Sequence, residues 1–215
     1  MTDKTTPNPA RKTYRHGDLR RALLDAGIAL AREGGPSSVV LREATRRVGV
    51  VPNAAYRHFA SRKELLEAVR AAAFAGLATS MEKELAALPP FEQPTAESAR
   101  ATLTAVGAGY LRFALAETGL FRTAFDGPFE PETDADPEKA GEGGMNPFQL
   151  LTNALDDLVE VGLLPPERRL GAEYLAWSAV HGMAMLAIDG PLYGRPPEQI
   201  GMLGQRLIGM VVNGL

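Results

Sequence analysis

Residues 41–59 read LREATRRVGVVPNAAYRHF, and this stretch decides the fold. Its apolar spacing predicts a short helix, a turn at Gly49 and another short helix that opens with Pro52, where the missing N–H costs little. A helix-turn-helix needs a small residue where its helices cross, a glycine in the turn and apolar groups around that turn. Thr45, Gly49 and Ala55 meet these needs. An ordinary helical hairpin could offer similar spacing, so the pattern by itself leaves both interpretations open.

Helical periodicity continues on both sides of this stretch. Leu19, Leu23 and Leu30 belong to one apolar stripe before it, and Ser61 can cap a long helix after it that continues until Pro89. That helix is long enough to join two domains, and the absence of β-alternation predicts an all-α fold. The predicted helices cover residues 18–32, 42–48, 52–59, 62–88, 148–162, 170–188 and 197–212, with one further helical face at Leu103, Val106, Tyr110 and Phe113.

Charge is distributed unevenly along the chain. Residues 1–70 contain 14 lysines and arginines against 7 acidic residues, a net charge of +7, whereas the rest of the chain carries −10. A basic end is the electrostatic footprint of a nucleic-acid module, although a chance cluster of solvated charges would look the same. The chain has no cysteine, no apolar run near the ~20 residues that span a bilayer, and no apolar signal core at its start. We therefore expect a cytoplasmic protein that does not enter the membrane.

Residues 41–66, LREATRRVGVVPNAAYRHFASRKELL, resemble the DNA-binding domain of the tetracycline-repressor (TetR) family. The resemblance extends back to YRHGDLRRALLDAGIALAREGG at residues 14–35, and its most specific parts are Tyr-x-x-Phe and the Ser-Arg-Lys-Glu-Leu-Leu that follows. It implies a three-helix, helix-turn-helix DNA-binding domain at 14–74, preceded by a flexible basic arm at 1–13. A long helix would join this domain to an α-helical effector-binding and dimerisation domain at 75–215.

The resemblance also implies roles on DNA for residues in and around the motif. Asn53 and Arg57 can donate to base edges, and Lys63 can hold a phosphate in the first turn of the long helix. Val40 and Val51 stand where the family usually has hydroxyl residues, so phosphate contacts and helix caps worth ~0.5–2 kcal/mol each are expected to be missing. The predicted DNA-binding residues are Arg15, Arg42, Arg46, Arg47, Pro52, Asn53, Ala54, Tyr56, Arg57, His58 and Lys63.

Residues 177–192, WSAVHGMAMLAIDGPL, resemble the C-terminal domain of a TetR branch marked by Trp, His and Gly, here Trp177, His181 and Gly182. The last two helices form the dimer interface in this family, which implies a homodimer on a palindromic double-stranded DNA operator. The resemblance also implies a pocket for a small hydrophobic effector, although aromatic and methionine side chains are equally typical of a plain core. The predicted pocket residues are Tyr110, Phe113, Phe121, Phe148, Trp177, His181 and Met185, with Phe125 and Met183 beside them.

Two further features bear on function. Residues 126–147 are rich in glycine, proline and acidic groups, which predicts a mobile loop and not a packed element. His16, His58 and His181 are far apart, so neither a metal nor another cofactor is expected, and no nucleophile–base pair or glycine-rich phosphate loop indicates an enzyme. We predict a DNA-binding transcription regulator, a repressor released by a small apolar ligand. A regulator without an effector, a helical-bundle enzyme and a purely structural helical dimer are the alternatives.

Overall fold

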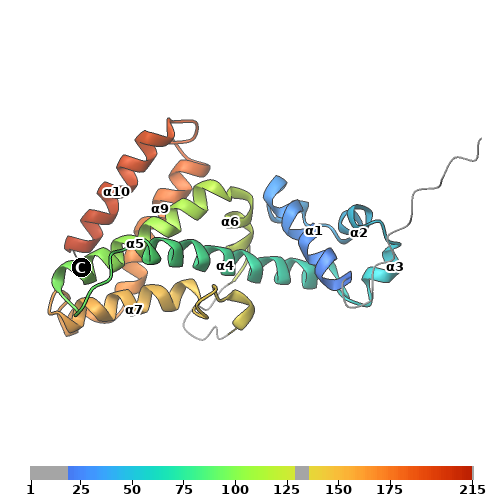
Figure 1. The fold of residues 1–215 in the computed structure, drawn as a ribbon. Helices are drawn as coiled ribbons and strands as arrows, with labels where there is room; N and C mark the ends of the chain where they lie inside the picture. The colour runs from blue at the N-terminus through green and yellow to red at the C-terminus, as the bar shows by residue number, and fades with distance from the viewer. Residues whose placement is uncertain (1–18, 129–135, 215) are drawn as a thin grey trace, which may run out of the picture.

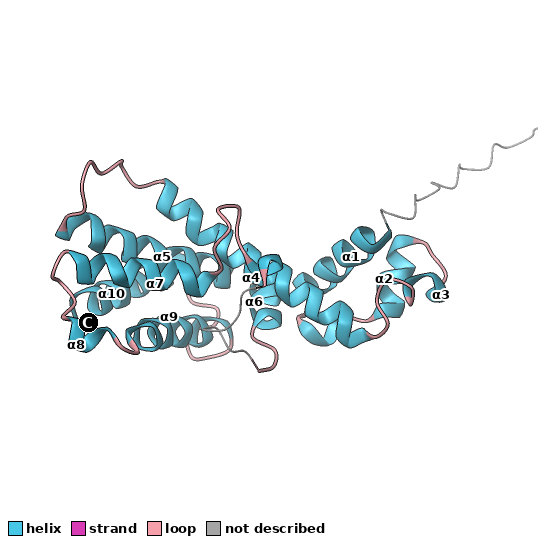
Figure 2. Ribbon diagram, turned by 90° about the horizontal axis from the view of Figure 1, so that it is seen from below, coloured by secondary structure: helices cyan, strands magenta, loops and turns pink. Residues whose placement is uncertain are grey.

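The computed structural model describes residues 19–128 and 136–214, and every regular element in these residues is a helix (Figure 1). This confirms the all-α prediction, including the helix-turn-helix domain and the separate helical domain. Figure 2 shows the two parts joined in the region of α4 and α6. The elements are α1 (Leu19–Gly34), η1 (Pro36–Ser38), α2 (Leu41–Val48), α3 (Pro52–Ala55), α4 (Arg62–Ala86), α5 (Ala96–Ala116), α6 (Thr118–Ala124), η2 (Pro137–Lys139), α7 (Pro147–Glu160), α8 (Pro166–Arg169), α9 (Ala172–Ile188) and α10 (Pro197–Gly214).

The N-terminal domain packs α1, α2 and α3 around the first turns of α4. Leu23 from α1, Phe59 after α3 and Leu65 from α4 are fully buried in its core. Gly27 permits close approach of α1 and α4, because a Cβ at that position would lie 2.8 Å from Cγ2 of Val69. Burial of the apolar stripe predicted for the first helix therefore fixes this domain onto α4.

Helix α4 is the connection between the two domains. Ser61 caps its start by accepting a hydrogen bond from the backbone N–H of Glu64 at 3.2 Å, and the Glu64 carboxylate accepts from the N–H of Ala60 at 2.6 Å. Near its other end, Ser80 donates to the carbonyl oxygen of Gly109 at 2.9 Å. A Cβ at Gly109 would collide with the backbone of Met81, so glycine is needed where α4 and α5 cross.

Helix α6 lies between the N-terminal domain and the rest of the bundle. Its Gly119 touches the end of α1 so closely that a Cβ would collide with the carbonyl oxygen of Ala31. Arg32 of α1 also forms a 2.9 Å ion pair with Glu117, the residue before α6. A movement of α6 would consequently press directly on the DNA-binding domain.

Residues 136–147, part of the segment 126–147 that was predicted as a mobile loop and not a packed element, pack against α4 in the structure. Nζ of Lys139 in η2 lies 6.0 Å from the ring centroid of Phe74 on α4. The backbone N–H of Gly143 donates to Oε1 of Glu82 at 3.0 Å, and the Asn146 side chain accepts from the N–H of Gln149 at 2.9 Å to cap α7. Polar contacts to α4 hold this segment, and a composition poor in apolar residues does not reveal them. Residues 129–135 lie outside the described residues.

Helices α9 and α10 form a hairpin at the far end of the bundle (Figure 1). The buried face of α9 is made largely by small side chains such as Ala176, Val180 and Ala184. Within α10 only Gly204 and Ile208 are buried. A broad apolar face on this hairpin therefore remains exposed; it comprises Tyr174, Leu175, Met185, Leu186, Met202, Leu203 and Met210 and is called the hairpin face below.

Candidate DNA-binding surface and effector pocket

The turn between α2 and α3 has the geometry that the motif predicted. Gly49 adopts a left-handed conformation, with φ 77°, and its N–H donates to the carbonyl oxygen of Thr45 at 2.9 Å. Thr45 is buried where a smaller residue is usual, and its hydroxyl donates to the carbonyl oxygen of Arg42 at 2.7 Å. Its extra polar atom is therefore satisfied within α2.

The exposed side chains of α3 and the following turn form one surface. Asn53, Tyr56 and Arg57 are exposed, whereas Ala54 and His58 are half-buried. Regular α3 ends at Ala55, four residues before the predicted helix end at Phe59, yet the N–H groups of His58 and Phe59 still bond back to the Ala55 carbonyl oxygen. The predicted base-reading side chains therefore extend from a single turn. Pro52 is exposed at its start.

The arginines of α2 differ in how freely they can reach DNA. Arg42 is exposed, whereas Arg46 forms a 2.6 Å ion pair with Glu43. Arg47, with a side chain only 27% exposed, contacts Glu33 of α1 through two nitrogens at 2.6 and 2.8 Å. Bonding to Arg46 and Arg47 lowers the pKa of Glu43 to about 2. A phosphate must compete with a permanently ionised Glu43 for Arg46.

The chain segment that leads into α2 is held by Arg62, a residue that was not among the predicted site residues. Its guanidinium donates to the carbonyl oxygens of Val39 at 2.8 Å and Pro36 at 2.7 Å, and so ties the start of α4 to the segment before α2. Neither Val40 nor Val51 makes a side-chain cap, as expected from their lack of a hydroxyl. Lys63 is exposed next to Arg62, while Arg15 and the rest of the basic arm lie outside the described residues.

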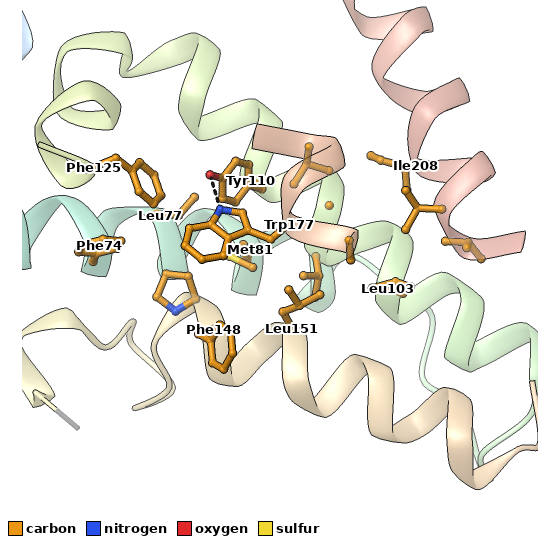
Figure 3. Close-up of a pocket in the computed structure, with 17 residues that line it drawn as sticks. Phe74, Leu77, Met81, Leu103, Tyr110, Phe125, Phe148, Leu151, Trp177 and Ile208 are labelled. Carbon is orange, nitrogen blue, oxygen red and sulfur yellow. Dashed lines mark hydrogen bonds between the residues drawn. The ribbon is translucent and has the colours of Figure 1, made fainter. Parts of the chain in front are cut away.

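A pocket opens in the C-terminal domain between α4, α5, α7, α9 and α10 (Figure 3). Only about 50 Å³ of it admits the centre of a water-sized sphere. It is consequently a narrow crevice. The residues that line it are Phe74, Leu77, Met81, Leu103, Val106, Gly107, Tyr110, Phe125, Pro147, Phe148, Leu151, Ala176, Trp177, Val180, Ile208, Val211 and Val212.

Three polar side chains meet at the pocket wall, two of them on the wall and His181 behind it. Nε1 of Trp177 donates to the hydroxyl oxygen of Tyr110 at 3.1 Å, and that hydroxyl lies 2.7 Å from Nδ1 of His181. Burial raises the pKa of Tyr110 and lowers that of His181, so both side chains stay neutral. The phenol can then donate to an unprotonated Nδ1, which satisfies all three groups.

The structure places only some of the predicted pocket residues on this wall. Tyr110 and Phe148 line it together with Trp177, and so does Phe125. Four predicted residues do not line it: Phe113, Phe121, His181 and Met185. Phe113 and Phe121 are buried core, while His181 bonds to Tyr110 from behind the wall, and Met185 is 38% exposed on the hairpin face. Met183 is buried outside the wall.

Sequence reasoning missed two of the walls. Phe74, Leu77 and Met81 come from α4, and their i, i+3, i+7 spacing was the available signal. The other wall is the end of α10, with Ile208, Val211 and Val212. Within residues 19–128 and 136–214, no cluster of three metal-binding side chains occurs, and no helix is long and apolar enough to cross a membrane.

Comparisons with known proteins agree with this arrangement. Residues 23–69 match the bacterial regulatory proteins of the tetR family, and residues 103–211 match the tetracyclin repressor-like C-terminal domain. No curated protein matches the chain. A protein of unknown function from Rhodococcus sp. RHA1 is 26% identical, with a TM-score of 0.73 over 95% of this chain and 99% of its own.

Two further solved structures share the fold at lower identity. The TetR family transcriptional regulator PfmR from Thermus thermophilus is 20% identical, with a TM-score of 0.56 over 90% of this chain and 98% of its own. A TetR variant from Acinetobacter baumannii AYE in complex with minocycline is 18% identical, with a TM-score of 0.61 over 89% and 93% of the two chains.

Proposed function

Because this chain belongs to the tetR family of bacterial regulatory proteins, which are DNA-binding transcription regulators and not enzymes, we propose that it is a homodimeric repressor released from its operator by a small apolar ligand. The observation that carries the proposal is the narrow apolar pocket, whose wall includes α4, the helix that continues into the DNA-binding domain. The exposed surface of Asn53, Tyr56 and Arg57 would read base edges, with Lys63 on a phosphate. Its place of action would be the cytoplasm.

The hairpin face supports a two-fold dimer. Its large apolar side chains come from adjacent helices, and an exposed patch of this kind marks an interaction surface. A Cβ at Gly182, Gly201 or Gly209 would meet no atom of this chain within 4 Å, so these glycines leave room for close approach by a partner helix. Gly204 has another role, since it packs against Leu111 within the protomer. A second copy of this chain is the partner that would cover the face, and it would present two α3 surfaces to a palindrome.

The route from pocket to DNA runs through α6. Phe125 lines the pocket immediately after α6, and its ring packs edge-on against Phe74 at 5.3 Å between centroids. The opposite end of α6 touches α1 through Gly119 and through the pair of Glu117 and Arg32. A ligand that displaced Phe125 would therefore shift α6 against the DNA-binding domain and change the separation of the two α3 surfaces.

The Trp-His-Gly branch is part of the same proposal. Trp177 and His181 both contact the hydroxyl of Tyr110, and Gly182 lies on the exposed side of the same helix. The branch residues would thus serve two surfaces of α9. Trp177 and His181 shape the pocket wall, and Gly182 serves the dimer.

The direct test starts from DNA selected from a random pool by the full chain. We expect a two-fold symmetric site, and titration with neutral apolar compounds should weaken its binding in fluorescence anisotropy. A selected DNA site without two-fold symmetry would contradict recognition by a dimer. If compounds that bind the pocket leave the affinity for DNA unchanged, the regulator without an effector would be favoured. Leu186→Glu should give monomers in sedimentation, whereas Leu170→Glu, an exposed leucine outside the hairpin face, should not.

A further inference from the structure

The chemistry of the pocket wall restricts what the effector can be. Figure 3 shows the 17 residues that line the pocket, and none of their side chains carries a charge. Within this wall the polar side-chain atoms are the hydroxyl of Tyr110 and the indole N–H of Trp177. A ligand in the crevice therefore meets almost only carbon.

These two polar groups are already engaged with each other. The indole N–H donates to the phenol oxygen at 3.1 Å, and the phenol hydrogen can donate to Nδ1 of His181 at 2.7 Å. Once these two hydrogen bonds are made, one lone pair of the Tyr110 oxygen remains for a ligand. The wall thus offers one acceptor and no donor, whereas carboxylates, sulfonates and phosphates all require donors or cations.

A lysine that contacts a ring of the wall does not change this conclusion. Nζ of Lys139 lies 6.0 Å from the centroid of Phe74, and Lys139 is not part of the pocket wall. An anion inside the crevice would lose its hydration without gaining a counter-charge. The pocket therefore binds an anionic ligand less tightly than a neutral one of the same skeleton.

The kinds of side chain that make up the wall differ between its two ends (Figure 3). Phe74 and Phe125 contribute aromatic rings at the end near α6, and Phe148 contributes another from the start of α7. Leu103 and Ile208 contribute aliphatic groups at the end near α10. Because little of the free space admits even the centre of a water-sized sphere, a ligand must displace wall side chains as it enters. A flat ring system at the aromatic end can pack against the phenylalanines in tilted or edge-on contacts.

We propose that the effector is an uncharged, flat, largely hydrocarbon molecule that carries at most one hydrogen-bond donor, and that the pocket rejects carboxylates, sulfonates and phosphates of similar skeleton. The effect of such a molecule on DNA rests on the proposed function. The preference for its charge state rests on the pocket alone.

A matched pair of fluorescent probes tests this preference on the full-length chain. N-phenyl-1-naphthylamine is neutral and consists of two flat ring systems, and 8-anilinonaphthalene-1-sulfonate is the same skeleton with one sulfonate. We expect the neutral probe to bind at least ~10-fold more tightly, a difference of about 1.4 kcal/mol or more. Equal or tighter binding of the sulfonate would overturn the proposal.

Variants locate the bound probe. Val180→Phe fills the crevice from α9 and should lower the affinity for the neutral probe at least ~10-fold. Ala176→Leu gives the same test with a smaller change if circular dichroism shows that the first variant does not fold. Leu170→Gln alters a side chain that is 96% exposed and lies outside both the pocket and the hairpin face, and it should leave the affinity unchanged. Unchanged affinity in both pocket variants would place the probe outside the pocket and overturn the proposal.

The outcome for DNA is measured separately. Selective binding of the neutral probe without any change in operator affinity would support this ligand class while contradicting release by the ligand. An anionic compound that displaces the neutral probe from the wild-type pocket and dissociates the operator would support release while overturning this ligand class.

Discussion

The guanidinium of Arg70 on α4 lies at the carboxyl end of α6, where its Nε donates to the carbonyl oxygen of Ala124 at 3.3 Å. A second nitrogen donates to the carbonyl oxygen of Pro128 at 3.3 Å, and the side chain is almost fully buried. A cation in this place also interacts favourably with the terminal carbonyls of α6. Since Phe125 follows Ala124 on the pocket wall, Arg70 joins the pocket to the helix that enters the DNA-binding domain.

Replacing Arg70 with methionine should separate α4 from α6. The buried carbonyl oxygen of Ala124 would lose its partner, so we expect a loss of roughly 1–3 kcal/mol in the free energy of unfolding, measured with urea. The change in operator affinity on saturation with N-phenyl-1-naphthylamine should become smaller. Arg112→Met is the matched control, because that arginine is exposed on α5. Equal effects of the two substitutions would contradict the connecting role of Arg70.

Base reading by Arg57 can be tested by its removal. The side chain is exposed beside Asn53 on the surface of the short α3 turn. Arg57→Ala should lower operator affinity by ~1–3 kcal/mol and relax the base preference at one position of each half-site. Selection from a random DNA pool measures this preference. Arg168→Ala, an exposed arginine on α8, should leave both quantities unchanged, and an unaltered set of selected sequences for Arg57→Ala would argue against base contact.

Lys63 should act on DNA of any sequence. It lies in the first turn of α4, and a phosphate held there would also meet the free N–H groups of that turn. Lys63→Ala should weaken binding to operator and to random DNA by the same factor. It should also make the slope of log K against log salt less steep by about 0.9. Anisotropy titrations over a range of salt concentrations give this slope. An unchanged slope would show that Lys63 does not contact a phosphate.

The helix-turn-helix could be predicted from the sequence because the residues that define it act locally. Gly49 provides the left-handed turn, Pro52 starts α3, and Ser61 caps α4 at the position that the sequence predicted. Each of these residues acts on backbone within a few positions of itself. The ion pair of Arg47 could not be predicted from such local signals, because its partner Glu33 belongs to another helix.

The pocket could be predicted only in part because α9 is apolar almost all round. Periodicity could not decide which stripe faces inward, and Met185 therefore fell on the wrong side of the helix. The walls from α4 and α10 depend on how helices far apart in sequence pack. Tyr110 and Trp177 were predicted correctly as wall residues, but the hydrogen bond between them follows from the crossing of α5 and α9.

Glu43 should limit how tightly the arginines of α2 hold DNA. It forms ion pairs with Arg46 at 2.6 Å and Arg47 at 3.4 Å, and with a pKa of about 2 it stays ionised near neutral pH. Glu43→Gln should therefore raise affinity for operator and random DNA together and make the salt dependence steeper. Glu97→Gln, which removes an exposed carboxylate from α5, controls for overall charge. The same gain in both variants would mean that net charge, and not the release of Arg46, is responsible.

Protonation of His181 should destabilise the fold. Burial lowers its pKa below the ordinary 6.5, and the facing side chains of Tyr110, Phe121, Phe125 and Trp177 are all neutral. As pH falls below about 6.5, the unfolded chain binds the proton before the folded chain does, so the free energy of unfolding decreases.

Urea unfolding at pH values of about 7.5 and 5.5 measures this loss in the wild type and in His181→Gln, whose amide oxygen can still accept from Tyr110 and does not titrate. We expect a smaller loss in this variant than in the wild type, since burial perturbs the pKa of His181 at the pocket. An equal loss for His181→Gln and the wild type would show that the proton is taken up elsewhere and that His181 does not depend on its neutral form to hold Tyr110.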